Sequence, residues 1–136
     1  MKKILTAAFC AAMASPALAQ GWPTGYEGVM LQGFYWDSYS DSQWKNLEKQ
    51  APELGSYFSL LWVPQSGKCL EEHNVMGYTP YYYFDQNSSF GSEAELRSMI
   101  RAMRQNGVGV LADVVIIHHN TNGWFSFPKE EYRGTT

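Results

Sequence analysis

Three apolar runs divide the chain, and two segments with helical spacing lie between them. The runs cover residues 29–34, 58–63 and 108–117, and each predicts a strand. The last run is almost entirely apolar and β-branched, so it predicts a strand that is buried on both faces. Such strands are typical of a parallel sheet that is covered by helices.

The first helical segment begins after Asp41 or Ser42, because either side chain can serve as the N-cap. Pro52 and Gly55 limit the helix, which either ends near Gln50 or continues for one more turn. Its apolar positions fall on one face: Trp44, Leu47 and Ala51.

The second helical segment has the clearest local signals in the chain. Ser92 and Glu95 stand three positions apart and predict a capping box at its start. Gly107 predicts its end. A helical face is formed by Leu96, Met99, Ile100 and Met103. The loop before this helix is about 25 residues long, well above the usual length, which indicates a functional segment.

The order strand, helix, strand, helix, strand predicts two parallel crossovers and an α/β fold. The pattern leaves two architectures open, a doubly wound sheet and a (β/α)₈ barrel. A barrel takes about 250 residues, so three strands and two helices are too few to close one. We therefore expect the chain to be the N-terminal part of a larger protein.

Residues 1–19 have the three parts of a secretory signal peptide. Lys2 and Lys3 precede an apolar run over 4–14, and Ala17-x-Ala19 supplies small residues at the cleavage site. The apolar run is too short for a permanent membrane span, which needs about 20 residues. The sequence predicts an exported protein, periplasmic or extracellular, with 20–136 as the mature chain.

The charge of the mature chain excludes some classes of partner. Without Lys2 and Lys3, eight basic residues remain against 13 acidic ones, which gives a net charge of −5 without a basic cluster. This balance argues against nucleic acid and an anionic membrane surface. Cys69 stands alone after the signal segment and is interpreted as a bystander thiol. The 5 Trp, 9 Tyr and 7 Phe suit a surface that stacks on sugar rings.

Asp113 is the one charged residue in the third apolar run. A buried carboxylate needs a partner, or a place near the exposed carboxyl end of its strand, where active sites of parallel α/β folds are built. His118 and His119 follow closely, so a functional cluster is favoured over a purely structural carboxylate. A metal site that also includes His73 is disfavoured, because the spacing fits no common zinc motif.

Five motifs carry a resemblance to a known family. They are LQGFYW (31–36), LWVP (61–64), MGYTP (76–80), FGSEAEL (90–96) and ADVVIIH (112–118). In this order and spacing the chain resembles the start of the catalytic barrel of α-amylases, which are α-glucan-active glycoside hydrolases, and especially plant and some bacterial members. The resemblance implies the first part of an incomplete (β/α)₈ TIM barrel, about three β/α units.

The resemblance also implies roles for four residues. Tyr78 matches a tyrosine that stacks on the glucosyl ring beside the scissile bond, and His118 matches a histidine that hydrogen-bonds the same sugar. Asp113 matches a structural carboxylate below the catalytic centre. Trp36 is expected to form part of the cleft wall.

The sequence departs from the family at the calcium ligand and lacks the catalytic carboxylates. The family has a calcium-binding Asn where this chain has Ile117, so calcium is doubtful as a cofactor unless Asn120 or a backbone carbonyl substitutes. The family's nucleophile and general acid/base lie about 5 Å apart, and both are expected beyond Thr136.

The leading interpretation is a secreted endo-hydrolase of α-1,4-glucosidic bonds in starch or maltooligosaccharides, which retains the anomeric configuration. The full-length protein is expected to be a monomer, and this segment alone is expected to be inactive. One alternative is a non-catalytic α-glucan-binding protein. Another is a transglycosylase or debranching enzyme of the same family.

Overall fold

A computed structural model describes residues 26–71, 73–82 and 84–120, so the predicted signal segment 1–19 lies outside the described residues. Three strands form one parallel sheet in the order β1-β2-β5: β1 (Met30–Gln32), β2 (Leu60–Val63) and β5 (Gly109–Ala112). Gln32 is level with Trp62, and Val63 is level with Ala112. The carboxyl ends of the strands therefore meet at one edge of the sheet.

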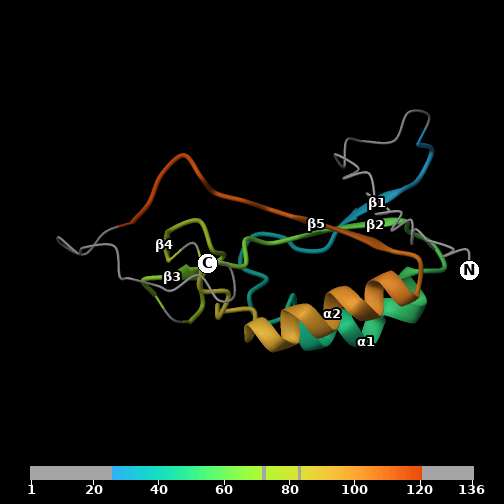
Figure 1. Cartoon of the computed structure of the whole chain (residues 1–136), viewed down its shortest axis with the longest axis horizontal. Coiled ribbons are helices and arrows are strands. Elements are labelled where there is room, and N and C mark those ends of the chain that lie inside the picture. Colours follow the sequence, from blue (N-terminus) through green and yellow to red (C-terminus); the bar gives the residue numbers. More distant parts are fainter. Residues whose placement is uncertain (1–25, 72, 83, 121–136) are drawn as a thin grey trace, which may run out of the picture.

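Two helices, α1 (Trp44–Leu54) and α2 (Glu93–Gln105), run side by side along one face of the sheet (Figure 1). Each helix presents its apolar face to the core, as the spacing predicts. Burying one such side chain stabilises the fold by about 1.5–3 kcal/mol. The side chains that are almost fully buried between the helices and β2 are Trp44, Leu61, Val63, Met99 and Met103.

The start of α1 differs from the prediction. The N-cap is Gln43, which makes no side-chain cap, and neither Asp41 nor Ser42 caps the helix. The Ser42 hydroxyl instead donates to the backbone carbonyl of Gly33, at 3.1 Å, and so joins the helix start to the end of β1. The helix passes through Pro52 and ends at Gly55, whose N–H closes the last turn on the Ala51 carbonyl, at 3.0 Å.

Helix α2 confirms its predicted boundaries. The Ser92 hydroxyl accepts from the Glu95 N–H, at 3.3 Å, and the Glu95 carboxylate accepts from the Ser92 N–H, at 2.9 Å. This reciprocal capping box satisfies two backbone donors at the helix start. Asn106 is the C-cap, and Gly107 follows with a φ of 77°. Of the two described helices, neither is long and apolar enough to cross a membrane.

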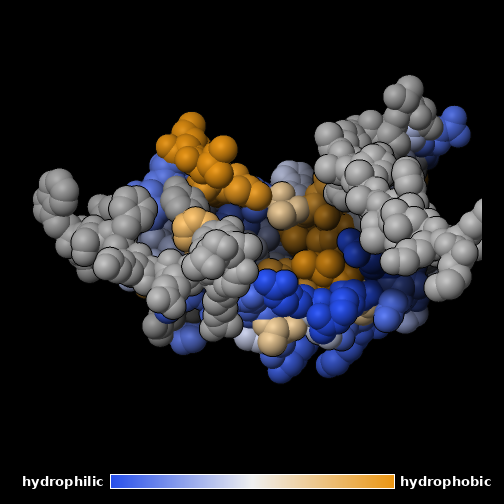
Figure 2. Space-filling view, viewed as in Figure 1, coloured by the Kyte–Doolittle hydropathy of each residue, from blue (hydrophilic) through white to orange (hydrophobic). Residues whose placement is uncertain are grey.

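The prediction for the third strand was wrong in length and in burial. Strand β5 ends at Ala112, and the chain then leaves the sheet, with Val114, Ile116 and Ile117 64%, 79% and 89% exposed. Figure 2 shows apolar side chains protruding where Figure 1 places the segment after β5. The physical reason is that β5 lies at the edge of the described sheet, with helices on one face only.

The long loop between β2 and α2 contains a short antiparallel hairpin that the sequence pattern did not predict. Its strands are β3 (Lys68–Cys69) and β4 (Pro80–Tyr82). Cys69, which was interpreted as a bystander thiol, is a buried free thiol on β3. The hairpin lies beyond the carboxyl ends of the parallel strands, and the segment after β5 runs toward it (Figure 1).

Candidate functional site

The four residues that the sequence nominated lie together at the carboxyl edge of the parallel sheet. Trp36 follows β1, Asp113 follows β5 directly, and Tyr78 comes from the loop after β2. His118 reaches the same place from the segment after β5. Contacts through Tyr78 join all of them, so we describe Tyr78, Asp113, His118 and Trp36 as the Tyr78 cluster.

Tyr78 and Asp113 form the polar centre of the cluster. The Tyr78 hydroxyl donates to Oδ2 of Asp113 at 3.1 Å, and the backbone N–H of Asp113 donates to the Val63 carbonyl at 3.2 Å. Partial burial, together with the neighbouring carboxylate, raises the pKa of Tyr78 to about 12. The phenol is therefore a neutral donor at physiological pH. Asp113 has both the partner and the position at the strand end that the sequence predicted.

Trp36 and Tyr78 form the aromatic part of the cluster. Their ring planes differ by 8°, and their centroids lie 6.0 Å apart, which is a parallel stacked arrangement. Trp36 remains 71% exposed, so the pair presents an aromatic surface to solvent. Exposed aromatic rings with a fixed orientation are typical components of ligand sites.

His118 contacts the backbone of Tyr78. Nε2 of His118 lies 2.7 Å from the Tyr78 carbonyl oxygen. Because a carbonyl oxygen only accepts, Nε2 carries the proton and donates. In a neutral ring, Nδ1 is then the acceptor nitrogen.

A buried glutamine, which the sequence analysis missed, holds the residue before Tyr78. Gln65 is 6% exposed; its Nε2 donates to the Gly77 carbonyl at 3.0 Å, and its Oε1 accepts from the Gly67 N–H. Gly77 has a φ of 93°, and a Cβ there would lie 2.6 Å from the Gln65 carbonyl oxygen. The signal that could have found Gln65 was a polar residue shortly after a buried strand, with Gly67 two positions later and Gly77 12 positions later.

His119 was nominated only as a neighbour of His118, but it has contacts of its own. Its Nε2 is hydrogen-bonded to the Tyr81 carbonyl oxygen. Its ring also lies parallel to the Tyr81 ring, with centroids 6.0 Å apart and planes 22° apart. The pair of adjacent histidines was the signal in the sequence, but their backbone partners were not predictable.

The residues at the expected calcium position do not fit that ion. Ile117 is 89% exposed and offers no side-chain oxygen. The backbone N–H of Asn120 donates to the Pro80 carbonyl at 2.8 Å, a contact that joins this segment to β4. Within residues 26–71, 73–82 and 84–120, no three His, Cys, Asp or Glu side chains form a group that could hold a metal, so His73 completes no such cluster.

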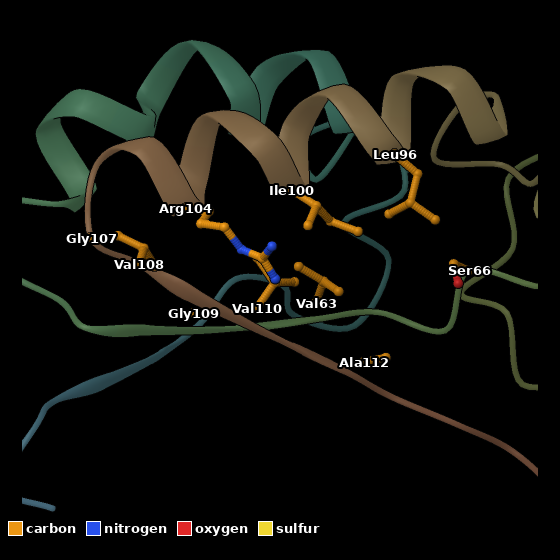
Figure 3. A pocket seen from close by; sticks show the side chains of 10 residues that line it. All are labelled: Val63, Ser66, Leu96, Ile100, Arg104, Gly107, Val108, Gly109, Val110 and Ala112. Atoms are coloured by element: carbon orange, nitrogen blue, oxygen red, sulfur yellow. The ribbon is translucent and has the colours of Figure 1, made fainter. Parts of the chain in front are cut away.

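A separate groove of about 360 Å³ lies between α2 and the sheet (Figure 3). Leu96 and Ile100 from α2 face Val63 and Val110 from the strands. Among the described residues that line it, Arg104 and Ser66 have polar side chains, and none is a carboxylate or a histidine. This groove is a packing surface, and the Tyr78 cluster is the better candidate for chemistry.

Comparison with solved structures defines the class of fold. The trehalose-6-phosphate hydrolase of Bacillus licheniformis aligns with a TM-score of 0.50 and 15% identity, over 57% of this chain and 14% of that protein. The strand order alone did not separate the two architectures. This similarity supports part of a (β/α)₈ barrel over a doubly wound sheet.

Curated relatives define the family, although no protein-family model matches the chain. A probable α-amylase of Arabidopsis thaliana is 36% identical over 66% of this chain and 21% of its own length. The glucan 1,4-α-maltotetraohydrolase of Stutzerimonas stutzeri is 31% identical over 88% of this chain and 26% of its own length. The chain belongs to the α-amylase family of glycoside hydrolases. It spans about a fifth to a quarter of these relatives.

Proposed function

We propose that the full-length protein is exported through residues 1–19 and hydrolyses α-1,4-glucosidic bonds in starch-like glucans. In this proposal the Tyr78 cluster forms one wall of the glucan-binding cleft. The names of the relatives support the bond type, because one is an α-amylase and another acts on 1,4-α-glucan. The family resemblance supports the position of the wall.

The observation that carries the proposal is the parallel pair of Trp36 and Tyr78 beside hydrogen-bonding groups. A sugar ring has apolar C–H faces and polar hydroxyl edges. An aromatic plane suits the face, and a small number of placed polar groups suits the edges. Trp36 and Tyr78 supply the plane, and His118 supplies an imidazole at its side.

Asp113 has a supporting role in this proposal. One of its carboxylate oxygens already accepts from the neutral Tyr78 hydroxyl, so the carboxylate fixes the orientation of the phenol. A retaining glycosidase uses two carboxyl groups about 5 Å apart, one as nucleophile and one as general acid/base. We assign both to residues beyond Thr136, and this segment contributes to binding and not to bond cleavage.

The test uses the full-length protein and starch. We expect new reducing ends, and nuclear magnetic resonance should show that the products first appear with the α-configuration of the substrate. Tyr78→Ala should reduce kcat/KM by about tenfold or more, because it removes the aromatic face and the Asp113 partner. Tyr57→Ala is the matched control, since Tyr57 is 71% exposed and lies between α1 and β2, before the strand begins.

Two outcomes would contradict the proposal. Folded full-length protein that binds maltoheptaose but releases no reducing ends from starch would favour the non-catalytic glucan-binding alternative. Equal kcat/KM values for Tyr78→Ala and Tyr57→Ala would remove the Tyr78 cluster from the cleft wall.

A further inference from the structure

Three successive residues join the segment after β5 to the hairpin strand β4 and the residues before it. His118 bonds to the Tyr78 carbonyl at 2.7 Å, and the Asn120 N–H donates to the Pro80 carbonyl at 2.8 Å. Between them in sequence, Nε2 of His119 bonds to the Tyr81 carbonyl. These bonds join residues that are about 40 positions apart in the chain, and they attach the segment after β5 to the long loop at the carboxyl edge of the sheet.

His119 makes two kinds of contact with one residue, Tyr81. Its Nε2 is bonded to the Tyr81 backbone, and its imidazole stacks on the Tyr81 ring. The hydrogen bond fixes the position of the imidazole along β4, and the stacking fixes the angle between the imidazole and the Tyr81 ring. Together they hold the backbone of β4 three residues after Tyr78.

We propose that His119 is a positioning residue for the glucan-binding wall. It holds the 78–82 segment against the segment after β5, so that Tyr78 is already oriented toward Trp36 before substrate arrives. This inference rests on the proposed function of the Tyr78 cluster. The inference adds His119 to the residues that the proposed function uses. The His119 side chain contacts Tyr81, and it affects the sugar only through the position of Tyr78.

The physical basis is the length of the loop that carries Tyr78. The connection between β2 and α2 spans about 30 residues, and the strand pair that its described residues form is the short β3–β4 hairpin, so bonds from other segments help to fix its shape. Ordering such a segment when ligand binds reduces affinity, whereas a segment that is already ordered avoids that loss. Removing His119 should therefore weaken binding of the ground state and the transition state alike.

The experiment separates the two contacts of His119 in the full-length protein. His119→Phe keeps a stacking ring and removes the donor, His119→Gln keeps an amide donor and removes the ring, and His119→Ala removes both. His73→Ala is the matched control, because His73 is an exposed histidine of the same loop. KM and kcat are measured on maltoheptaose, together with the thermal midpoint.

We expect His119→Ala to raise KM about fivefold and to change kcat by less than about twofold, the pattern of lost uniform binding. His119→Gln and His119→Phe should each recover part of the affinity, and His73→Ala should match the wild type. A purely structural role would instead lower the thermal midpoint and the active fraction, which reduces apparent kcat and leaves KM unchanged. That result, or a wild-type KM for His119→Ala, would overturn the inference.

Failure of the proposed hydrolysis can be distinguished from failure of this inference. If the full-length wild type releases no products, calorimetric titration with maltoheptaose still reports the affinity of each variant. A weaker affinity of His119→Ala than of His73→Ala would support the positioning role in a non-catalytic protein. Equal affinities, or no binding by any variant, would overturn it.

Discussion

The hydroxyl of Tyr78 donates a 3.1 Å hydrogen bond to the carboxylate of Asp113, which is 35 positions further along the chain. The bond joins a residue of the long loop to the residue that directly follows β5. It gives the carboxylate at the strand end a hydrogen-bond donor, and it sets the direction of the phenol. The orientation of the Tyr78 ring therefore depends in part on one charged side chain.

The first prediction concerns the stability of the protein in alkali. Partial burial, and then the bond to Asp113, raise the pKa of Tyr78 from 10.0 to about 12. A raised pKa means that folding favours the neutral phenol, so this stabilisation is complete below pH 10 and is lost between pH 10 and about 12. Denaturant unfolding across this window should show a steeper loss of stability for the wild type than for Tyr78→Phe. Parallel curves would contradict the shift.

A titration of the Tyr78 phenol tests how much Asp113 contributes to the raised pKa of Tyr78. Asp113→Asn removes the negative charge but leaves an amide oxygen that can accept from the phenol, and it leaves the burial of the phenol in place. The pKa of Tyr78 should therefore fall only part of the way toward 10.0, since burial is the largest single cause and remains. Ultraviolet absorbance of the tyrosinate, with Tyr78→Phe subtracted as the reference, measures this value directly. A complete return to the ordinary value would mean that the carboxylate is the main cause.

The second prediction compares two glycines that both have positive φ angles. Gly107→Ala should destabilise the protein by about 1–2 kcal/mol, the conformational penalty alone, because no atom lies within 4 Å of the added Cβ. Gly77→Ala should have that penalty and a further loss of about 1–3 kcal/mol, since its Cβ would meet the Gln65 carbonyl at 2.6 Å. Denaturant unfolding of the full-length protein measures both, and equal losses would disprove the steric contribution.

The third prediction concerns the buried amide of Gln65. Gln65→Leu leaves the Gly77 carbonyl and the Gly67 N–H without this partner, and each buried group left unpaired costs about 1–3 kcal/mol. Gln105→Leu is the control, because Gln105 is exposed at the end of α2 and such changes stay within about 0.5 kcal/mol. Unfolding free energies give the comparison. A loss for Gln65→Leu no larger than for the control would show that water replaces both partners.

The fourth prediction concerns the calcium position. Ile117→Asn supplies a carboxamide oxygen, which is a ligand that Ca²⁺ accepts, at a side chain that is 89% exposed. We expect calcium to raise the thermal midpoint of this variant more than that of the wild type, because binding to the folded state is stabilising. Ile116→Asn, beside it and 79% exposed, is the matched control. An equal calcium response of the two variants would argue against a ligand role for position 117.

The helices show where sequence patterns were sufficient and where they were not. The start of α2 was predictable because Ser92 and Glu95 cap each other within one turn. The start of α1 was not, because the Ser42 hydroxyl bonds to Gly33, nine positions earlier, in place of its own helix. The apolar run after Gly107 predicted that a strand lies there but not its length or its burial, because the pattern could not reveal where the chain leaves the sheet.

The candidate site divides in the same way. Residue type, strand-end position and family resemblance are sufficient to nominate Tyr78, Asp113, His118 and Trp36 as parts of one site. Gln65 was missed, and His119 was nominated without its contacts, because their partners are carbonyl groups 12 and 38 positions away. Every residue has such a carbonyl, so no sequence pattern marks the one that is used.

That choice of partners has a consequence for how the loop can change during evolution. Gln65, His118, His119 and the Asn120 N–H all bond to main-chain carbonyl oxygens between Gly77 and Tyr81. Each of these bonds survives any substitution of the residue that supplies the carbonyl, provided the backbone keeps its path. These backbone bonds are thus largely independent of which side chains the loop carries. In the proposed function, the preference for one glucan over another can therefore change through side chains such as that of the exposed Thr79, while the backbone bonds stay in place.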